Sequence, residues 1–202
     1  MVNSEPAWKD VHIEIAKEYG HKFDEIVFKK MMGRKEDDAI QIFIDYFSLS
    51  ESIPVLQKKR KEMVIKKIPS IPVNKGLLNL LDLLDKLHIK KAIATSAFSD
   101  IADRMIKHIG VFERFPVIVT GDMVINGKPN PEIYLKAAKN LGVDPKQTLV
   151  IEDAQNGVES GYNAGMKVIA IPHKASKHHD FSKATLILPS MEEITEDLLK
   201  SL

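Results

Sequence analysis

Three groups of polar residues stand where runs of apolar residues end, and together they could bind a phosphate ester. Thr95 and Ser96 end the run that begins at Lys91, Lys128 lies in a Gly-Lys-Pro turn before a predicted helix, and Glu152 and Asp153 follow the run 148–151. A hydroxyl and backbone N–H groups can hold phosphoryl oxygens, while a lysine offsets their charge. Carboxylate oxygens are ligands that Mg²⁺ prefers. These residue types therefore favour a phosphate site that uses Mg²⁺.

Each group also has a purely structural explanation. Thr95 and Ser96 could cap the helix that follows them. Lys128 could be a solvent-exposed turn lysine, and the carboxylates of Glu152 and Asp153 could complement a helix dipole. The order of the three groups, and their shared position after predicted strands, favours a site over three unrelated features.

The elements that must position these residues alternate along the second part of the chain. Apolar runs at 91–95, 116–119, 148–151, 167–171 and 185–188 predict strands, and residues 77–87, 99–109, 131–141 and 154–164 predict helices. Nearly continuous apolar runs are typical of strands buried on both faces. Strands that alternate with helices indicate an α/β fold with a parallel sheet. Function then collects at the carboxyl ends of the strands.

The first part of the chain reads as helices only. Apolar residues recur with a helical period in the ranges 7–19, 24–32, 35–47 and 53–68. Pro69 and Pro72 close this region as a hinge or linker. The basic run from Lys58 to Lys67 is interpreted as a solvated helix face, and no spacing among the histidines argues for a metal site.

Composition sets bounds on the class of protein. The 202 residues are 44% hydrophobic and 28% charged, with a formal net charge of +1, so the charge does not indicate nucleic acid or an anionic membrane as the main partner. The chain has no cysteine, which excludes disulfides and cysteine-based chemistry. No apolar stretch approaches the roughly 20 residues that span a bilayer, and the first residues do not form a signal peptide. We expect a soluble cytoplasmic protein.

Four segments together resemble motifs of the haloacid-dehalogenase-like (HAD) superfamily of phosphohydrolases. They are residues 91–96 (Lys-Ala-Ile-Ala-Thr-Ser), 127–134 (Gly-Lys-Pro-Asn-Pro-Glu-Ile-Tyr), 150–159 (Val-Ile-Glu-Asp-Ala-Gln-Asn-Gly-Val-Glu) and 164–166 (Ala-Gly-Met). They are most similar to the subgroup with a small helical cap, which includes β-phosphoglucomutase, sugar-phosphate phosphatases and pseudouridine-phosphate phosphatase. The resemblance implies a Rossmann-like parallel core at 73–202 and an all-helical cap at 7–72.

The resemblance also implies a role for each site residue. Thr95 and the Ser96 N–H would hold the transferring phosphoryl group, and Lys128 would bridge that group and the nucleophile. Asp153 would be a ligand of Mg²⁺, and Glu152 would be a second ligand or would hold a metal-bound water. In the cap, the segment Met32-Gly33-Arg34-Lys35 resembles that of the subgroup. Arg34 and Lys35 would then touch the substrate, although a solvated basic patch explains them equally well.

The family's first motif, a strand followed by Asp-x-Asp-Gly, is not found in the sequence. Residues 1–6 resemble only the trailing end of that motif, and no Asp-x-Asp occurs elsewhere. The first aspartate of the motif is the family's nucleophile, so this exact chain is expected to be inactive. The motif's strand lies centrally in the family's sheet, and each buried backbone group left unpaired costs about 1–3 kcal/mol. We therefore expect a true start about 10–15 residues upstream of Met1.

Several functions stay open from the sequence. The first is a Mg²⁺-dependent phosphohydrolase of a small phosphate monoester, such as a sugar phosphate, and a phosphomutase of the β-phosphoglucomutase type is its variant. The second is a catalytically inactive relic that still binds phosphate. An unrelated nucleotide binder is disfavoured because no Gly-rich loop follows a strand, and a dehalogenase would not need Glu152 and Asp153. The expected partner is a small phosphorylated metabolite, with no nucleic acid and no membrane, and the expected state is a monomer.

Overall fold

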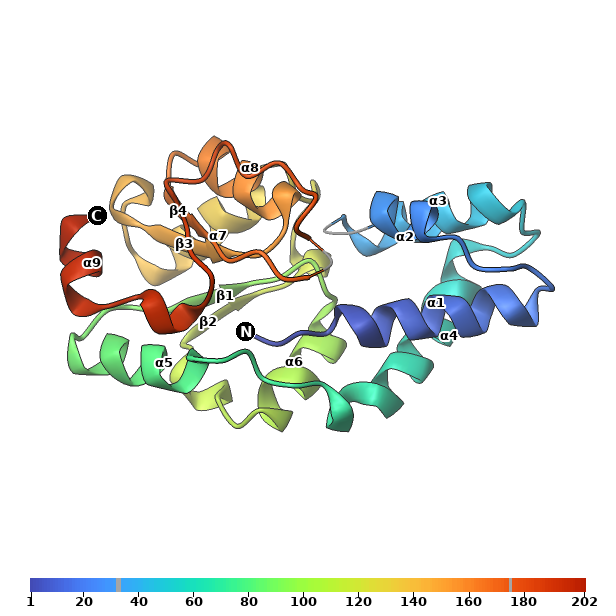
Figure 1. Cartoon of the computed structure of the whole chain (residues 1–202), viewed down its shortest axis with the longest axis horizontal. Helices are drawn as coiled ribbons and strands as arrows, with labels where there is room; N and C mark the ends of the chain where they lie inside the picture. The colour runs from blue at the N-terminus through green and yellow to red at the C-terminus, as the bar shows by residue number, and fades with distance from the viewer. Residues whose placement is uncertain (32–33, 175) are drawn as a thin grey trace.

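A computed structural model describes residues 1–31, 34–174 and 176–202 as an α/β protein with a helical lobe beside a mixed lobe (Figure 1). The helical lobe holds the first four helices, and the mixed lobe holds the strands with the remaining helices around them. The predicted α/β class is therefore confirmed. None of the helices in the described ranges has the length and apolar character that crossing a bilayer requires.

The helical lobe is built from amphipathic helices that bury one stripe each. Its helices are α1 (Glu5–Glu18), α2 (Glu25–Met31), α3 (Glu36–Phe47) and α4 (Ile53–Lys67), and a short 3₁₀ helix (Ile68–Ser70) follows. Pro6 and Pro54 stand in the first turns of α1 and α4, where a missing N–H costs no helical hydrogen bond. Ile15, Ile40 and Phe43 are almost fully buried at the centre of this lobe.

The mixed lobe alternates strands and helices as the apolar runs predict. Its helices are α5 (Leu77–Lys86), α6 (Ser99–His108), α7 (Glu132–Leu141), α8 (Gln155–Asn163) and α9 (Glu196–Ser201). Its strands are β1 (Ala92–Ala94), β2 (Val117–Val119), β3 (Leu149–Glu152), β4 (Lys167–Ala170) and β5 (Leu186–Ile187). Short 3₁₀ helices lie at Phe112–Arg114, Gly121–Met123, Pro145–Gln147 and Met191–Glu193.

The strands of the described residues form two parallel sheets rather than one. In the first sheet β1 pairs with β2, with Ile93 opposite Ile118. In the second, β4 lies between β3 and β5, with Val150 opposite Val168. Four of these strands are shorter than the apolar runs that predict them, because the ladders cover only the paired residues, and β3 is shifted by one residue to end at Glu152.

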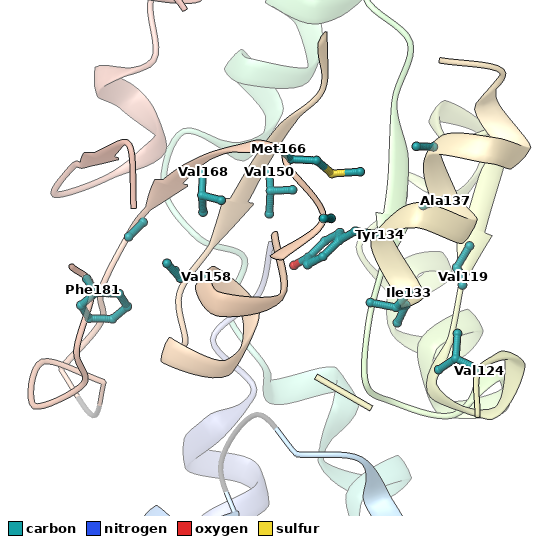
Figure 2. Packing of buried hydrophobic residues seen from close by; sticks show 13 residues of the cluster. Val119, Val124, Ile133, Tyr134, Ala137, Val150, Val158, Met166, Val168 and Phe181 are labelled. Atoms are coloured by element: carbon teal, nitrogen blue, oxygen red, sulfur yellow. The ribbon is translucent and has the colours of Figure 1, made fainter. Parts of the chain in front are cut away.

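One hydrophobic cluster joins the two sheets through α7 (Figure 2). Ile133 and Tyr134 of α7 share this cluster with Val119 of β2 and Val150 of β3. Figure 1 places α7 and α8 on one side of the strands, and α5 and α6 on the other. The helices thus form layers above and below the strands. The carboxyl ends of β1 and β3 lie toward the helical lobe.

Candidate active site

Lys128 joins the carboxyl ends of β1 and β3. It stands in the turn before α7, and its Nζ lies 2.5 Å from Glu152 Oε1 and 3.3 Å from Ala94 O. Ala94 is the last residue of β1 and Glu152 the last of β3. Both strands therefore end at the same edge, and the three predicted groups meet there.

The Glu152 carboxylate is the most heavily bonded group of the site. It accepts hydrogen bonds from Lys128 Nζ and Tyr134 OH, both at 2.5 Å on Oε1, and its Oε2 accepts the Asp153 N–H at 3.0 Å. Burial would raise the pKa of Glu152, but the Lys128 ammonium and these hydrogen bonds outweigh it and lower the pKa to about 2. Glu152 is therefore an ionised, fixed carboxylate at neutral pH.

Gly157 lets this carboxylate lie against the start of α8. A Cβ built on Gly157 would stand 2.1 Å from Glu152 Cδ, which no side chain permits. The glycine in the segment 150–159 thus has a packing reason: it makes room for the carboxylate that Lys128 holds.

Asp153 faces the solvent side of the site and has different neighbours. Its side chain is 45% exposed, and its Oδ2 lies 3.5 Å from His173 Nε2. Partial burial and the Glu152 charge raise the pKa of Asp153, against the opposing charges of the Met1 ammonium, His173 and Lys128. His173 in turn places its Nδ1 3.0 Å from Glu5 Oε2, at the start of α1. Asp153 is the carboxylate of the pair that is open to a ligand.

Thr95 does not cap the next helix. Its hydroxyl oxygen accepts the Ala97 N–H at 3.2 Å in a local turn, whereas the residue before α6 is Phe98, whose side chain has no capping group. The backbone N–H of Thr95 is bonded to Val119 O at 3.0 Å, which extends the β1–β2 pairing. The Thr95 side chain is thus held at the strand end, with its hydroxyl hydrogen available for a ligand.

A cavity of about 1060 Å³ connects these groups to the helical lobe. The predicted site residues Thr95, Ser96, Lys128, Glu152 and Asp153 all line it, and so does Arg34. Its wall on the side of the helical lobe also includes Trp8, His12, Glu36 and Arg60. The structure therefore brings the five predicted residues of the mixed lobe to one cavity. Residues of the helical lobe, which lies far from them in the sequence, line the same cavity.

The two predicted substrate residues of the cap have their own polar partners. Arg34 Nε donates to Lys30 O at 2.8 Å. Lys35 Nζ donates to the carbonyl oxygens of Val124 and Ile125, both at 3.3 Å, so it ties the helical lobe to the mixed lobe. Lys35 is not among the residues that line the cavity. Met32 and Gly33, the other half of the predicted segment, lie outside the described residues.

Arg60 corrects the interpretation of the basic run as a solvated face. Its side chain is 8% exposed, its Nη1 lies 3.2 Å from Glu36 Oε1, and its Nε donates to His12 Nε2 at 3.0 Å. Burial lowers the pKa of Arg60 to about 10, against the opposing charge of Glu36. The guanidinium also lies 5.0 Å from the Trp8 ring. The run is solvated at its lysines, but Arg60 is a buried cation at the cavity wall.

Sequence reasoning also missed Tyr134, His173 and Glu5 as members of the site. Tyr134 stands two residues after Glu132 in the quoted segment, and a tyrosine on the buried face of a helix usually finds a partner for its hydroxyl. Arg60 had a clearer signal, because Leu56, Arg60 and Val64 recur at four-residue spacing on one buried face. His173 and Glu5 are 168 positions apart, and no local pattern could have paired them.

The donor set for a divalent cation is of the right chemistry but small. Glu152 and Asp153 offer hard carboxylate oxygens, as Mg²⁺ requires. Both oxygens of Glu152 are already bonded within the protein, which leaves Asp153 as the open donor. In the parts of the chain that the structure describes, no group of three or more His, Cys, Asp or Glu side chains converges on one point. These residues fit a cation held partly by a ligand such as a phosphate.

The fold and the site define a class. Residues 1–171 match the family model of haloacid dehalogenase-like hydrolases, and the chain belongs to this family. It is 30% identical over 172 residues to a phosphorylated carbohydrates phosphatase of Thermotoga maritima, covering 84% of this chain and 79% of that protein. It is 32% identical over 180 residues to (DL)-glycerol-3-phosphatase 1 of Arabidopsis thaliana, covering 85% of this chain and 60% of that protein. The chain thus spans between about half and nine tenths of the lengths of the curated relatives it matches.

Solved structures show the same fold. The chain matches CbbY from Rhodobacter sphaeroides with a TM-score of 0.87 and 23% identity, covering 96% of this chain and 91% of that one. It matches β-phosphoglucomutase from Clostridium difficile with a TM-score of 0.87 and 20% identity, covering 100% of this chain and 91% of that one. The α/β architecture with a helical cap is therefore that of haloacid dehalogenase-like enzymes, and the Rossmann-like core predicted from the sequence is confirmed.

Proposed function

We propose that this chain binds a small phosphate monoester, such as a phosphorylated carbohydrate, and supports Mg²⁺-assisted phosphoryl transfer from it to water. The observation that carries this proposal is the convergence of Thr95, Ser96, Lys128, Glu152 and Asp153 on one cavity. The names of the Thermotoga and Arabidopsis relatives, a phosphorylated carbohydrates phosphatase and a glycerol-3-phosphatase, support the substrate class.

Each residue has a role that follows from its contacts. The Thr95 hydroxyl and the Ser96 N–H donate to phosphoryl oxygens, and Lys128 offsets their charge from a position fixed by Glu152. Preorganised donors of this kind stabilise charge that develops in a transition state. Glu152 acts by holding Lys128, because its own oxygens are already bonded.

Asp153 is the residue that we propose holds Mg²⁺, together with oxygens of the bound phosphate. When bound, the ion would supply Lewis-acid stabilisation of the phosphoryl charge. Glu152, one residue away, would orient a metal-bound water or act as a second ligand only through a further lone pair on an oxygen that already accepts a hydrogen bond. His173 would compete for Asp153, since it lies 3.5 Å from the same carboxylate.

The helical lobe covers the site and supplies its specificity in this proposal. Arg34 and Arg60 both line the cavity and are the cations that a polyol or a second anionic group of the substrate would meet. Lys35 would help to dock the lobe through Val124 O and Ile125 O rather than touch the substrate. Closure of such a lobe excludes water and contacts the leaving group.

A second function is supported by the sequence itself. The chain contains no Asp-x-Asp pair. These 202 residues therefore offer no nucleophile of the Asp-x-Asp type for the reaction. A phosphate-binding protein without turnover would use the same five residues. A phosphomutase is the third possibility, for which the β-phosphoglucomutase structure provides a likeness of fold alone.

One pair of assays separates these functions. Release of p-nitrophenol from p-nitrophenyl phosphate with Mg²⁺ is measured for this chain and for a version extended at its amino end by a designed strand ending in Asp-x-Asp-Gly. Turnover only by the extended version supports the enzyme, and binding of inorganic phosphate without turnover by either supports the binding protein. Absence of both overturns the proposal. Phosphate binding should be lost in Lys128→Met and kept in Lys139→Met, since Lys139 lies exposed on α7, the helix that follows the turn of Lys128.

A further inference from the structure

Tyr134 has no role in the proposed function, yet it contacts both members of the buried ion pair. Its hydroxyl donates to Glu152 Oε1 at 2.5 Å, and the centroid of its ring lies 4.8 Å from Lys128 Nζ. Tyr134 is buried and lines the same cavity as Lys128. The tyrosine can therefore act on the lysine in two ways, through its ring directly and through its hydroxyl by way of Glu152.

The position of Tyr134 follows from the start of α7. Tyr134 is the third residue of this helix, and its N–H donates to Pro131 O at 3.1 Å. Side chains of a helix tilt toward its amino end. The ring therefore leans back toward the turn that carries Lys128, and Figure 2 shows it reaching from α7 toward the side of Val150 in β3.

The hydroxyl of Tyr134 restricts where the ammonium group can bind. A carboxylate oxygen has two lone-pair positions, and on Glu152 Oε1 one of them accepts from the Tyr134 hydroxyl. Lys128 Nζ binds at the other, at 2.5 Å. The second oxygen, Oε2, accepts the Asp153 N–H, and Gly157 packs against the carboxylate, which holds Glu152 in one orientation. The ammonium is thus confined to one point of the carboxylate.

The ring of Tyr134 supports the same ammonium from another side. A lysine ammonium within about 6 Å of an aromatic centroid is attracted to the face of the ring. Because a lysine has a flexible stem of four carbons, contacts at its end are needed to fix it. An ammonium has three N–H donors, and the two acceptors recorded for Lys128, Glu152 Oε1 and Ala94 O, leave one donor for a ligand in the cavity.

We propose that Tyr134 is a positioning residue, which fixes Lys128 so that the remaining N–H donates to the phosphoryl group. The proposal rests on the proposed function for the identity of the ligand. Tyr134 acts through Lys128 and Glu152, because its own hydroxyl is bonded to Glu152. A donor that is already oriented before the ligand binds needs no reorganisation, and this is the condition under which such groups stabilise phosphoryl charge well.

Core packing would explain the ring of Tyr134 but not the choice of partner for its hydroxyl. The ring belongs to the hydrophobic cluster that includes Val119, Ile133 and Val150. A buried tyrosine needs a partner for its hydroxyl, but packing does not select the carboxylate oxygen that also binds Lys128. The two explanations differ for Tyr134→Phe, which keeps the ring and removes the hydroxyl. Packing alone predicts that phosphate binding is unchanged in this variant.

The first test is the binding of inorganic phosphate to the whole chain, measured by calorimetry. Tyr134→Phe should weaken binding by about threefold to tenfold, because the hydrogen bond that fixes Glu152 is lost. Tyr134→Leu, which also removes the ring, should weaken binding further. The control is Tyr162→Leu on α8, since Tyr162 is exposed, has Lys183 Nζ 5.6 Å from its ring and is not among the described residues that line the cavity. This variant should bind phosphate like the wild type.

The ammonium group of Lys128 gives a second measurement, which needs no phosphate. Hydrogens of a buried, hydrogen-bonded group exchange slowly with water, so the ammonium is observable by NMR. Its signal is assigned by its loss in Lys128→Met. The signal should be present in the wild type and in Tyr162→Leu, weaker in Tyr134→Phe and absent in Tyr134→Leu. Circular dichroism shows whether each variant folds, and Tyr134→Phe carries the test if Tyr134→Leu does not.

The outcomes separate this proposal from the proposed function. An unchanged phosphate affinity in Tyr134→Phe, or an unchanged ammonium signal in it, would overturn the positioning role and leave Tyr134 as a packing residue. Equal weakening of phosphate binding in Tyr162→Leu would overturn it as well. A wild type that binds no phosphate would overturn the proposed function, and the ammonium signal alone would then decide whether Tyr134 fixes Lys128.

Discussion

Lys128 Nζ lies 2.5 Å from Glu152 Oε1 and 3.3 Å from Ala94 O, so a single ammonium group bridges two strands that share no ladder. Both side chains of the ion pair are largely buried, with 7% and 11% of their surfaces exposed. The pair thus has two functions in the molecule. It positions a cation for a phosphoryl group, and it links the β1 half of the mixed lobe to the β3 half.

Removal of Lys128 should therefore destabilise the fold. Lys128→Met leaves the Glu152 carboxylate buried beside Tyr134 without its cation, and we expect a loss of about 3–5 kcal/mol in the free energy of unfolding. Urea denaturation followed by circular dichroism measures this loss. The double variant Lys128→Met with Glu152→Gln should be less destabilised than Lys128→Met alone, because no unpaired charge remains. A double variant at least as unstable as the single one would show that the pair's charge is not the cause.

Gly157 should be sensitive to a single methyl group. Gly157→Ala would place Cβ 2.1 Å from Glu152 Cδ, and this carboxylate is held by Lys128 and Tyr134. We expect a loss of stability of about 2–4 kcal/mol from displacement of the carboxylate, within the range of overpacked and broken buried networks. Gly161→Ala on the same helix is the control, since its Cβ would meet a methyl group of Val168 at 2.8 Å, which can move. Similar losses in thermal unfolding of the two variants would contradict the special role of Gly157.

The sequence could predict that these residues lie together at one edge because their positions obey a local rule. Thr95, Lys128 and Asp153 each follow a strand or precede a helix at the same edge, and apolar runs with polar ends reveal that arrangement. The α/β class and the approximate strand positions follow from the same runs. The ends of the strands were predicted less accurately. β1 and β5 end where their pairing with a neighbouring strand ends, and pairing depends on two segments rather than one.

Tertiary placement explains what the sequence did not reveal. Arg60 was hidden in a run of lysines, and only its packing against Glu36 and His12 distinguishes it from them. His173 meets Glu5 from the other end of the chain, a pairing that no spacing encodes. The division of the strands into two sheets follows from which edges meet, and an apolar run contains no information on its neighbours.

Arg60 and its neighbour Lys61 should respond differently to the same substitution. Arg60→Met leaves Glu36 buried without its cation, so a loss of about 3–5 kcal/mol in unfolding free energy is expected. Lys61, whose side chain is 45% exposed and paired at the surface with Asp100, should change stability by about 0.5 kcal/mol or less when replaced by Met. Urea denaturation of both variants at pH 7 compares them. Equal effects at the two positions would mean that the burial of Arg60 carries no energetic weight.

Two histidines should give the stability opposite dependences on pH. Burial, together with the Arg60 charge, holds the pKa of His12 well below its usual value, so the unfolded chain binds a proton that the folded one does not. This contribution is complete above about pH 6.5 and is lost as the pH falls, at no more than about 1.4 kcal/mol per pH unit for one proton. The hydrogen bond to Glu5 instead raises the pKa of His173, so its contribution is present below about pH 6.5 and is lost as the pH rises through the raised pKa.

Unfolding of the wild type, His12→Gln and His173→Gln by urea between pH 5.5 and 8 measures these contributions. In His12→Gln, the free energy of unfolding should fall less steeply with decreasing pH than in the wild type, whatever the absolute stability of the variant. His173→Gln should cost more at pH 6 than at pH 8, because only the protonated histidine pairs with Glu5. The difference from wild type, taken at each pH, removes the titration of all other groups. A difference that does not vary with pH for either variant would contradict the assigned protonation of that histidine.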